Sequence, residues 1–403
     1  LDFNFAATKK LDPRLEYQRT GPASFVNELG KVVLFGENVP RFDHNPTTRE
    51  SLGILIEESR TNLFLYGTTP GDTWAGAKNG TFTENTTETT APDGTFTATK
   101  WTFTDNDPYL YQTTTLSANT TYTISMWVKA GTNMAGDALQ SRIGAAPFAS
   151  SDLTIPTDGS WKRITYTKTV GGSNETSANV GWEPQTLPGL GTPASGDVIY
   201  IWGAQLEVGG FVTSFIPTNG STATRERDEL TMSGSDLTDV FNEVEGTMFY
   251  EASLGDLTND NQPIVAFRDL GTVTANYHAM GWRIGGGTSV IRTWFKSASN
   301  NEHLSAHAST GLTANMFYKH IYGYKDADCA DAYRTSTNSG ILSNQTGNGS
   351  PMIAAGVVDE LRFGGYYAYE SQPTTYGLDA GHIKRFSYWP QKLTNTQLTT
   401  YIS

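Results

Sequence analysis

The chain has 403 residues, which exceeds what one compact hydrophobic core accommodates and predicts two or three domains. Its formal net charge of −13 excludes the basic footprint that a nucleic-acid-binding protein needs. The single cysteine, Cys329, excludes an intrachain disulfide framework and a cysteine-rich zinc site.

The composition favours β structure. Aromatic residues make up 12% of the chain and charged residues only 17%, while Thr and Gly are abundant. Thr, Tyr, Phe, Val and Ile suit pleated, half-buried surfaces, so an all-β fold is expected. No stretch approaches the roughly 20 apolar residues of a membrane-spanning helix, so membrane insertion is not expected. The chain begins at Leu1 without a signal-peptide pattern, which is consistent with a fragment or a processed product.

Residues 1–60 differ from the rest of the chain. Short apolar runs alternate with turn residues at Gly21-Pro22, Gly30 and Gly36, which predicts β-hairpins. A short apolar strand, Leu52 to Ile56, comes next. The predicted unit is an N-terminal hairpin or attachment element, too thin to bury much surface alone.

Residues 61–218 carry strand-like segments at the spacing of a β-sandwich. In TYTISMWVKAG, alternation places four apolar side chains on one face of a strand: Tyr122, Ile124, Met126 and Val128. Two faces of different polarity indicate a sheet with one side on a core. We therefore expect a jelly roll or a related sandwich.

Residues 219–233 are predicted to form a linker. The charged run Arg225–Glu229 in it predicts a solvated face, and a contact between domains is the alternative. Residues 234–403 predict a second sandwich. The closing segment LTNTQLTTYIS predicts a short terminal helix with Thr394 as its N-cap and three apolar residues, Leu393, Leu398 and Ile402, at helical spacing.

Three segments resemble a bacteriophage virion module: RFDHNP at Arg41–Pro46, LGILIEESRTNL at Leu52–Leu63, and GAQLEVGGFVTSFIPT at Gly203–Thr218. The chain between them is similar to a carbohydrate-binding-module-type jelly roll. The last third, through GHIKRFSYWPQKLTNTQL at Gly381–Leu398, resembles the concanavalin A-like, laminin-G-like fold.

The resemblance implies a phage virion structural protein on the tail or capsid surface, such as a tail-fibre or receptor-binding component that contacts host surface polysaccharide. It also implies contacts with other virion proteins and a homo-oligomer such as a trimer. Two alternatives stay open: an architectural head-decoration or fibre protein without a glycan ligand, and a polysaccharide depolymerase.

Sugars are bound by aromatic rings that stack on the C–H faces of pyranoses and by polar side chains that form hydrogen bonds with the sugar hydroxyls. Exposed aromatic residues are therefore the candidates for a sugar-binding site. In the turn-prone stretch RFGGYYAYESQPTTYG and at the sandwich edges these are Tyr366, Tyr367, Tyr369, Tyr376, Trp389, Trp74, Tyr109, Tyr111 and Trp182. Packing of the four tyrosines against another subunit or domain is the alternative. Tryptophans embedded in strands are assigned to the core: Trp101, Trp127, Trp161, Trp202, Trp282 and Trp294.

No cofactor is required, and structural calcium is the one metal considered. The candidate ligands lie in KDADCADAY: Asp326, Asp328 and Asp331. Similar oxygen-rich loops occur at residues 105–107 and 256–260, but none has the Gly and terminal Glu of an EF-hand loop, so a solvated turn is the alternative.

Enzyme signatures are scarce, so no catalytic residue is assigned. Laminarinase-type hydrolases of the concanavalin A-like fold place acidic residues alternately on one strand, whereas Asp359 and Glu360 are adjacent and point to opposite faces. His303 and His307 have i, i+4 spacing but lack the Glu of a zincin motif. The chain is therefore expected not to be an enzyme.

Overall fold

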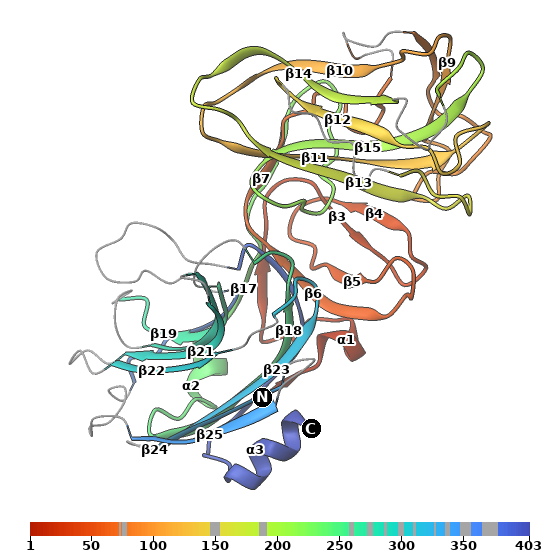
Figure 1. Ribbon diagram of the computed structural model, residues 1–403. Helices are drawn as coiled ribbons and strands as arrows, with labels where there is room; N and C mark the ends of the chain where they lie inside the picture. Colours follow the sequence, from red (N-terminus) through yellow and green to blue (C-terminus); the bar gives the residue numbers. More distant parts are fainter. Residues whose placement is uncertain are drawn as a thin grey trace.

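A computed structural model describes residues 1–71, 74, 79–145, 154–184, 192–257, 262–271, 277–285, 288–296, 302–308, 312–325, 328–334, 339–346, 356–364 and 378–403. Its regular structure is nearly all β and forms two sandwiches, which confirms the predicted fold class (Figure 1). The helices in these ranges are short: α1 (Phe5–Thr8), α2 (Ser235–Thr238) and α3 (Asn395–Ile402). None of them is long and apolar enough to span a membrane.

The first sandwich pairs a five-stranded with a three-stranded sheet. The larger sheet has the order β13-β11-β15-β9-β8, with β8 (Gly80–Thr83), β9 (Thr99–Phe103), β11 (Thr121–Ala130), β13 (Lys162–Thr169) and β15 (Val198–Val208). The smaller has the order β10-β14-β12, with β10 (Leu110–Leu116), β12 (Leu139–Ile143) and β14 (Glu175–Pro184). The four apolar residues expected on one face of β11 are all buried in the core between these sheets, as predicted: Tyr122, Ile124, Met126 and Val128.

The second sandwich pairs an eight-stranded with a seven-stranded sheet. The first has the order β25-β24-β23-β18-β27-β6-β5, with β1 also on β27; its strands are β1 (Asp2–Phe3), β5 (Phe42–His44), β6 (Ser51–Glu57), β18 (Glu245–Leu254), β23 (Phe317–Lys325), β24 (Asp328–Arg334), β25 (Ser339–Thr346) and β27 (Ala380–Trp389). The second has the order β2-β17-β26-β19-β20-β21-β22, with β2 (Glu16–Gln18), β17 (Glu229–Ser233), β19 (Gln262–Arg268), β20 (Tyr277–Gly285), β21 (Thr288–Lys296), β22 (Glu302–Ala308) and β26 (Glu360–Phe363).

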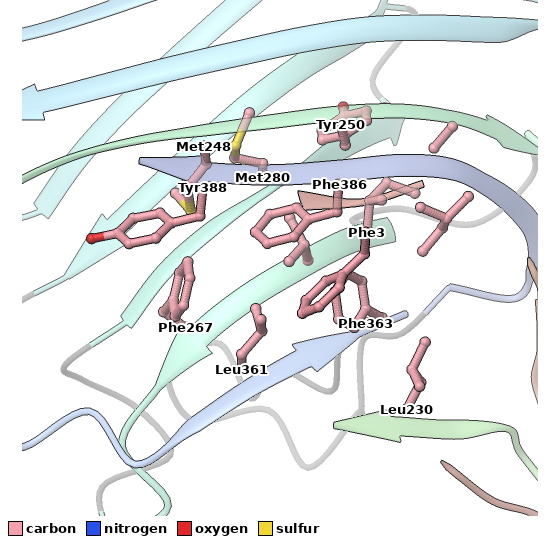
Figure 2. Close-up of a cluster of buried hydrophobic side chains, with 14 of the residues drawn as sticks. Phe3, Leu230, Met248, Tyr250, Phe267, Met280, Leu361, Phe363, Phe386 and Tyr388 are labelled. Carbon is pink, nitrogen blue, oxygen red and sulfur yellow. The ribbon is translucent and has the colours of Figure 1, made fainter. Parts of the chain in front are cut away.

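The core of the second sandwich draws on both ends of the chain. Phe3 stacks near Phe386 of β27, with ring centroids 6.3 Å apart, and meets the edge of Phe363 at 6.2 Å (Figure 2). Leu230 of β17 belongs to the same hydrophobic cluster. Because these residues come from positions 3, 230, 363 and 386, the sandwich cannot be completed before nearly the whole chain is present.

Residues 1–60 are therefore not a separate hairpin element. Strands β1, β5 and β6 join one sheet of the second sandwich and β2 joins the other. Only β3 (Ala23–Val26) and β4 (Val32–Phe35) form a two-stranded sheet of their own within this segment. The chain thus begins the second sandwich, builds the first, and returns to finish the second.

The expected linker, residues 219–233, is largely strand. β16 (Ala223–Arg225) pairs with β7 (Arg60–Asn62), so the chain leaves for the first sandwich and returns along one antiparallel ribbon. β17 then pairs with β2 and β26. The charged run is not solvated throughout, because Arg225 and Asp228 are buried. The alternative, a contact between domains, describes these two side chains correctly.

A buried group of five ionised side chains lies where the two sandwiches meet, and we call it the junction cluster: Arg19, Arg41, Glu57, Arg225 and Asp228. Arg41 lies between the two acids, with one guanidinium nitrogen 2.5 Å from Glu57 and the other on Asp228. Arg225 lies 3.0 Å from Glu57, and Arg19 3.6 Å from Asp228. The cluster joins the segments RFDHNP, LGILIEESRTNL and RERDEL through direct ion pairs.

Ser214, in the segment after β15, completes the coordination of Glu57. Its backbone N–H and hydroxyl donate to the carboxylate at 2.8 and 2.6 Å. Burial alone would raise the pKa of Glu57, but Arg225, Arg41 and the Ser214 hydrogen bonds outweigh it and hold that pKa well below its usual range.

This shift predicts acid sensitivity. The unfolded Glu57 carboxyl titrates near 4.5, so on acidification the unfolded chain takes up this proton before the folded one. The stabilisation is fully present above about pH 5.5 and is lost as the pH falls through 4.5 toward the folded pKa. Urea unfolding between pH 7 and pH 3 should show falling stability, and Glu57→Gln should be less stable at pH 7 and respond less steeply to acid. An unchanged slope in that variant would contradict the assignment.

The predicted terminal helix is confirmed. Thr394 caps α3, because its hydroxyl accepts the N–H of Gln397 at 3.3 Å while the Gln397 side chain accepts the N–H of Thr394 at 2.9 Å. Leu393, Leu398 and Ile402 pack together against β18 and β23 residues, as their spacing predicts.

Candidate functional site

The face of the three-stranded sheet that points away from the first core carries aromatic, charged and amide side chains. This sheet lies on the side of the first sandwich away from the second sandwich (Figure 1). Along β10, β12 and β14, residues such as Leu110, Leu139 and Val180 point into the core. The alternate residues point outward. We call them, with Tyr109, the outer sheet face: Tyr109, Tyr111, Thr113, Gln140, Arg142, Asn179, Gly181 and Glu183.

Gly181 allows two side chains to approach each other across this sheet. It is the register partner of both Tyr111 on β10 and Arg142 on β12. A Cβ at this position would lie 2.0 Å from the carbonyl oxygen of Leu110 and 2.9 Å from Cδ1 of Tyr111. The absence of a side chain therefore lets the Tyr111 ring lie over β14.

The Tyr111 ring is fixed from several sides. Tyr109 stacks on it with centroids 4.9 Å apart and an interplanar angle of 13°, and the Arg142 guanidinium lies 5.4 Å from its centroid. Its hydroxyl donates to Glu183 Oε2. Burial and the Glu183 carboxylate both raise the pKa of Tyr111, so the phenol stays protonated and donates at neutral pH.

Around this fixed ring the face offers groups that reach the surface. Tyr109, Arg142 and Glu183 are half-buried, while Thr113 is exposed and its hydroxyl donates to Asn179 Oδ1 at 3.2 Å. A flat surface with a ring, a guanidinium, a carboxylate and amides can stack on C–H faces and exchange hydrogen bonds with hydroxyls. It can bind an extended polyhydroxylated chain without enclosing it.

Gly181→Ala should destabilise the first sandwich by at least about 1 kcal/mol, because the new Cβ meets backbone that cannot move freely. Gly172→Ala is the matched control, since a Cβ there meets nothing within 4 Å. Thermal unfolding of the two variants gives the comparison. Equal midpoints would show that the Tyr111 ring does not need this glycine.

The structure corrects three of the predicted aromatic contacts. Trp74 and Trp182 are 2% and 0% exposed and pack with Phe64 inside the first core, with Phe64 centroids 4.6 and 5.9 Å away. Their polar flanking residues suggested loop edges, but these large rings fill the sandwich interior. Tyr111 is 4% exposed, so it shapes the outer sheet face and does not itself offer a free ring.

Two predicted aromatics reach the surface in part. Tyr109 is half-buried on the outer sheet face. Trp389 is half-buried at the end of β27, where its ring lies 4.7 Å from that of Tyr401 on α3. The structure therefore places Tyr109 and Tyr111 together and Trp389 far from them in the second sandwich.

The core assignments are confirmed for Trp101, Trp202 and Trp282, which are fully buried. Trp127 and Trp161 are half-buried and pack against a smaller cluster around Phe215. The side chain of Trp294 is not among those described.

The other predicted sites lie outside the described residues. This holds for the tyrosine cluster Tyr366, Tyr367, Tyr369 and Tyr376, for Asp326, and for the side chains of Asp328 and Asp331. Within the described ranges, no group of three or more His, Cys, Asp or Glu side chains could hold a metal ion. Asp105, Asn106 and Asp107 are exposed, in a turn held by the Asn106 N–H on Asp105 Oδ1 at 2.7 Å.

The titratable groups considered for catalysis have structural partners. Glu360 pairs with Arg268 at 2.6 Å, and Asp359 accepts the backbone N–H of Leu270 at 2.9 Å. Two further histidines also have polar neighbours: His382 Nε2 lies 2.8 Å from Asp43 Oδ2, and His44 Nδ1 lies 3.2 Å from the Val26 carbonyl oxygen.

Sequence reasoning missed six members of the outer sheet face: Thr113, Gln140, Arg142, Asn179, Gly181 and Glu183. The spacing in SANVGWEP carries the signal, since Ala178, Val180 and Trp182 stand two positions apart, whereas LQSRI is apolar only at its two ends. What this spacing does not contain is the pairing of β12 with β14, which brings these polar positions beside the Tyr111 strand.

No protein-family model and no curated protein matches the chain. Among solved structures, it is similar to the NanB sialidase from Streptococcus pneumoniae, with 15% identity, a TM-score of 0.31, and coverage of 42% of this chain and 26% of that one. It is also similar to the CBM22-1–CBM22-2 tandem domain of Paenibacillus barcinonensis Xyn10C (11% identity, TM-score 0.26, 83% and 97% covered). Domains LG4-5 of the mouse laminin alpha1 chain give 12% identity and a TM-score of 0.24, with 70% and 87% covered.

Proposed function

We propose that this protein binds glycan chains, without cleaving them, through the outer sheet face of the first sandwich. The observation that carries the proposal is the arrangement around Gly181, where the half-buried Tyr109 ring, the Arg142 guanidinium and the Glu183 carboxylate surround the buried Tyr111 ring. These groups match the C–H faces and hydroxyls of a sugar chain.

An open sheet face suits a polymer better than a single small molecule. Its polar groups lie on three adjacent strands, and neighbouring strands are about 4.8 Å apart, so a chain that crosses them meets several groups in turn. Each contact is weak by itself, but contacts made along one chain add together.

In its finer form, the proposal is that the protein is a phage tail-fibre or receptor-binding component and that the glycan is a host surface polysaccharide. The support is the resemblance of residues 41–46, 52–63 and 203–218 to virion modules. Antibody labelling in electron micrographs of phage particles tests this part: label on the tail is the expected result, and label absent from purified particles would overturn it.

Binding is tested by native electrophoresis of the purified protein in gels that contain candidate host polysaccharides, together with an assay for new reducing ends and unsaturated sugars. We expect retardation by at least one polysaccharide and no release of sugar. Migration unaffected by every polysaccharide would contradict the proposal. Retardation with release of sugar would favour a depolymerase.

An architectural role without a glycan is the second candidate, and the junction cluster is the observation that favours it. Its buried ion pairs are joined by hydrogen bonds to Ser214, in the segment after β15 of the first sandwich, and so contribute to a fixed junction such as a load-transmitting fibre or decoration protein would need. For this role we expect label on the particle, no retardation in any gel, and the predicted tyrosine cluster at Tyr366–Tyr369 buried between subunits.

A further inference from the structure

A cavity of about 280 Å³ lies beside the junction cluster, where the two sandwiches meet. Its walls come from β3 and β4, from β5 and β6, from β11 and β13, from the segment after β15, from Gly255 and Asn315, and from β27. It is nearly twice the roughly 150 Å³ of an engineered cavity that binds benzene, so it has room for one six-membered ring with substituents.

The charged groups that line this cavity have partners within the protein, and Glu57 among them is paired with Arg41 and Arg225. Asp43 accepts the backbone N–H of Val26 at 2.6 Å and lies 2.8 Å from His382 Nε2. Arg163 donates to the carbonyl oxygen of Thr213 at 2.7 Å and to Ser125 Oγ at 2.9 Å. Since the lining carries two carboxylates, Asp43 and Glu57, beside the Arg163 guanidinium and the His382 imidazole, it has no large excess of either sign and favours a neutral ligand over an ion.

The remaining wall is largely apolar and partly aromatic: Phe25, Val32, Leu55, Trp127, Phe211 and Val212. The Trp127 ring is held in place by Arg163, whose guanidinium lies 4.3 Å from its centroid. Asp43 and His382 keep 13% and 14% of their side chains exposed, so hydroxyl groups of a ligand can reach them. A rigid ring beside a few polar tips is the lining of a small-molecule site.

We infer that this cavity is a second binding site, distinct from the outer sheet face, that takes one neutral, hydroxylated six-membered ring, namely a single sugar unit. The choice of a sugar rests on the proposed function, whereas the size and neutrality of the ligand come from the cavity itself. Because both sandwiches contribute walls, the bound sugar contacts both and stabilises their arrangement.

The test is titration of the full chain with glucose, galactose, N-acetylglucosamine and N-acetylgalactosamine, monitored by tryptophan fluorescence and the thermal midpoint. At least one of these sugars should give a saturable fluorescence change and a concentration-dependent rise in the midpoint. Val212→Trp, which fills the cavity from its half-buried edge, should weaken that response at least tenfold while polysaccharide retardation persists.

Arg142→Met, on the outer sheet face, is the matched control and should leave the single-sugar response unchanged. If Val212→Trp does not fold, Phe211→Leu should weaken the response several-fold, because it shortens one wall. The inference is overturned if no sugar changes either signal, if the filled variant responds like the wild type, or if Arg142→Met removes the response. If the wild type is not retarded by any polysaccharide but still gives the single-sugar response, the proposed function is contradicted and the cavity site is supported.

Discussion

Arg41→Met is expected to lower the free energy of unfolding by about 3–5 kcal/mol, the largest effect of a single substitution that we predict. Methionine keeps much of the volume of the side chain but removes the charge that lies between Glu57 and Asp228. Both carboxylates would remain buried, each 2% exposed, with fewer positive charges beside them to offset the cost of burying a negative charge. Urea unfolding at pH 7 measures the change.

Lys9→Met is the control for removal of a positive charge in general. Lys9 pairs with Glu28 at 3.4 Å, but the two side chains are 40% and 67% exposed. Exposed pairs contribute about 0–1 kcal/mol, so this variant should unfold almost like the wild type. If Arg41→Met lost no more stability than Lys9→Met, the buried ion pairs of the junction cluster would not stabilise the fold.

Arg142→Met is expected to weaken binding of the polysaccharide identified by gel retardation by about 10- to 150-fold, because a hydrogen bond from a charged donor contributes about 1.5–3 kcal/mol. The methionine side chain can still cover the Tyr111 ring, which Arg142 now covers from 5.4 Å, so the thermal midpoint should stay within about 2 °C of the wild type. Mobility at graded polysaccharide concentrations gives the affinity.

Lys9→Met again provides the charge-matched control, because it removes the same charge in the other sandwich. Tyr367→Ala provides the comparison within the predicted tyrosine cluster of the second sandwich. A loss of affinity in Tyr367→Ala and none in Arg142→Met would move the binding site to the second sandwich.

The sequence predicted the features that depend on local patterning. The alternation from Tyr122 to Val128 identified a strand with one face in a core, and that face is buried. Thr394 and Gln397 identified the capped start of α3, because an N-cap depends only on residues three positions apart. Both features are decided within one turn or one strand.

Pairing between distant segments could not be predicted in the same way. β6 pairs with β27, so Ile54 meets Ile383 from the far end of the chain, and no local pattern contains that choice. Arg225 and Asp228 look like a solvated charge run because a buried ion pair and an exposed one use the same residue types. Their burial depends on Arg41 and Glu57, which lie far away in the sequence.

Candidate aromatics were predicted from their neighbours in sequence, and this succeeded only in part. Trp74 comes after Gly71 and Asp72 and so resembles a loop residue, yet its ring lies in the first core. Tyr109 and Tyr111 are stacked on the same face, as their spacing of two residues in a strand allows. Their polar partners come from two other strands and emerge only with the sheet order.

Amide hydrogen exchange of the full chain, with and without the retarding polysaccharide, tests the glycan site most directly. Binding at the outer sheet face predicts slower exchange in β10, β12 and β14, and no such change in Arg142→Met at the same polysaccharide concentration. Protection confined to the second sandwich, or equal protection in the wild type and the variant, would contradict it.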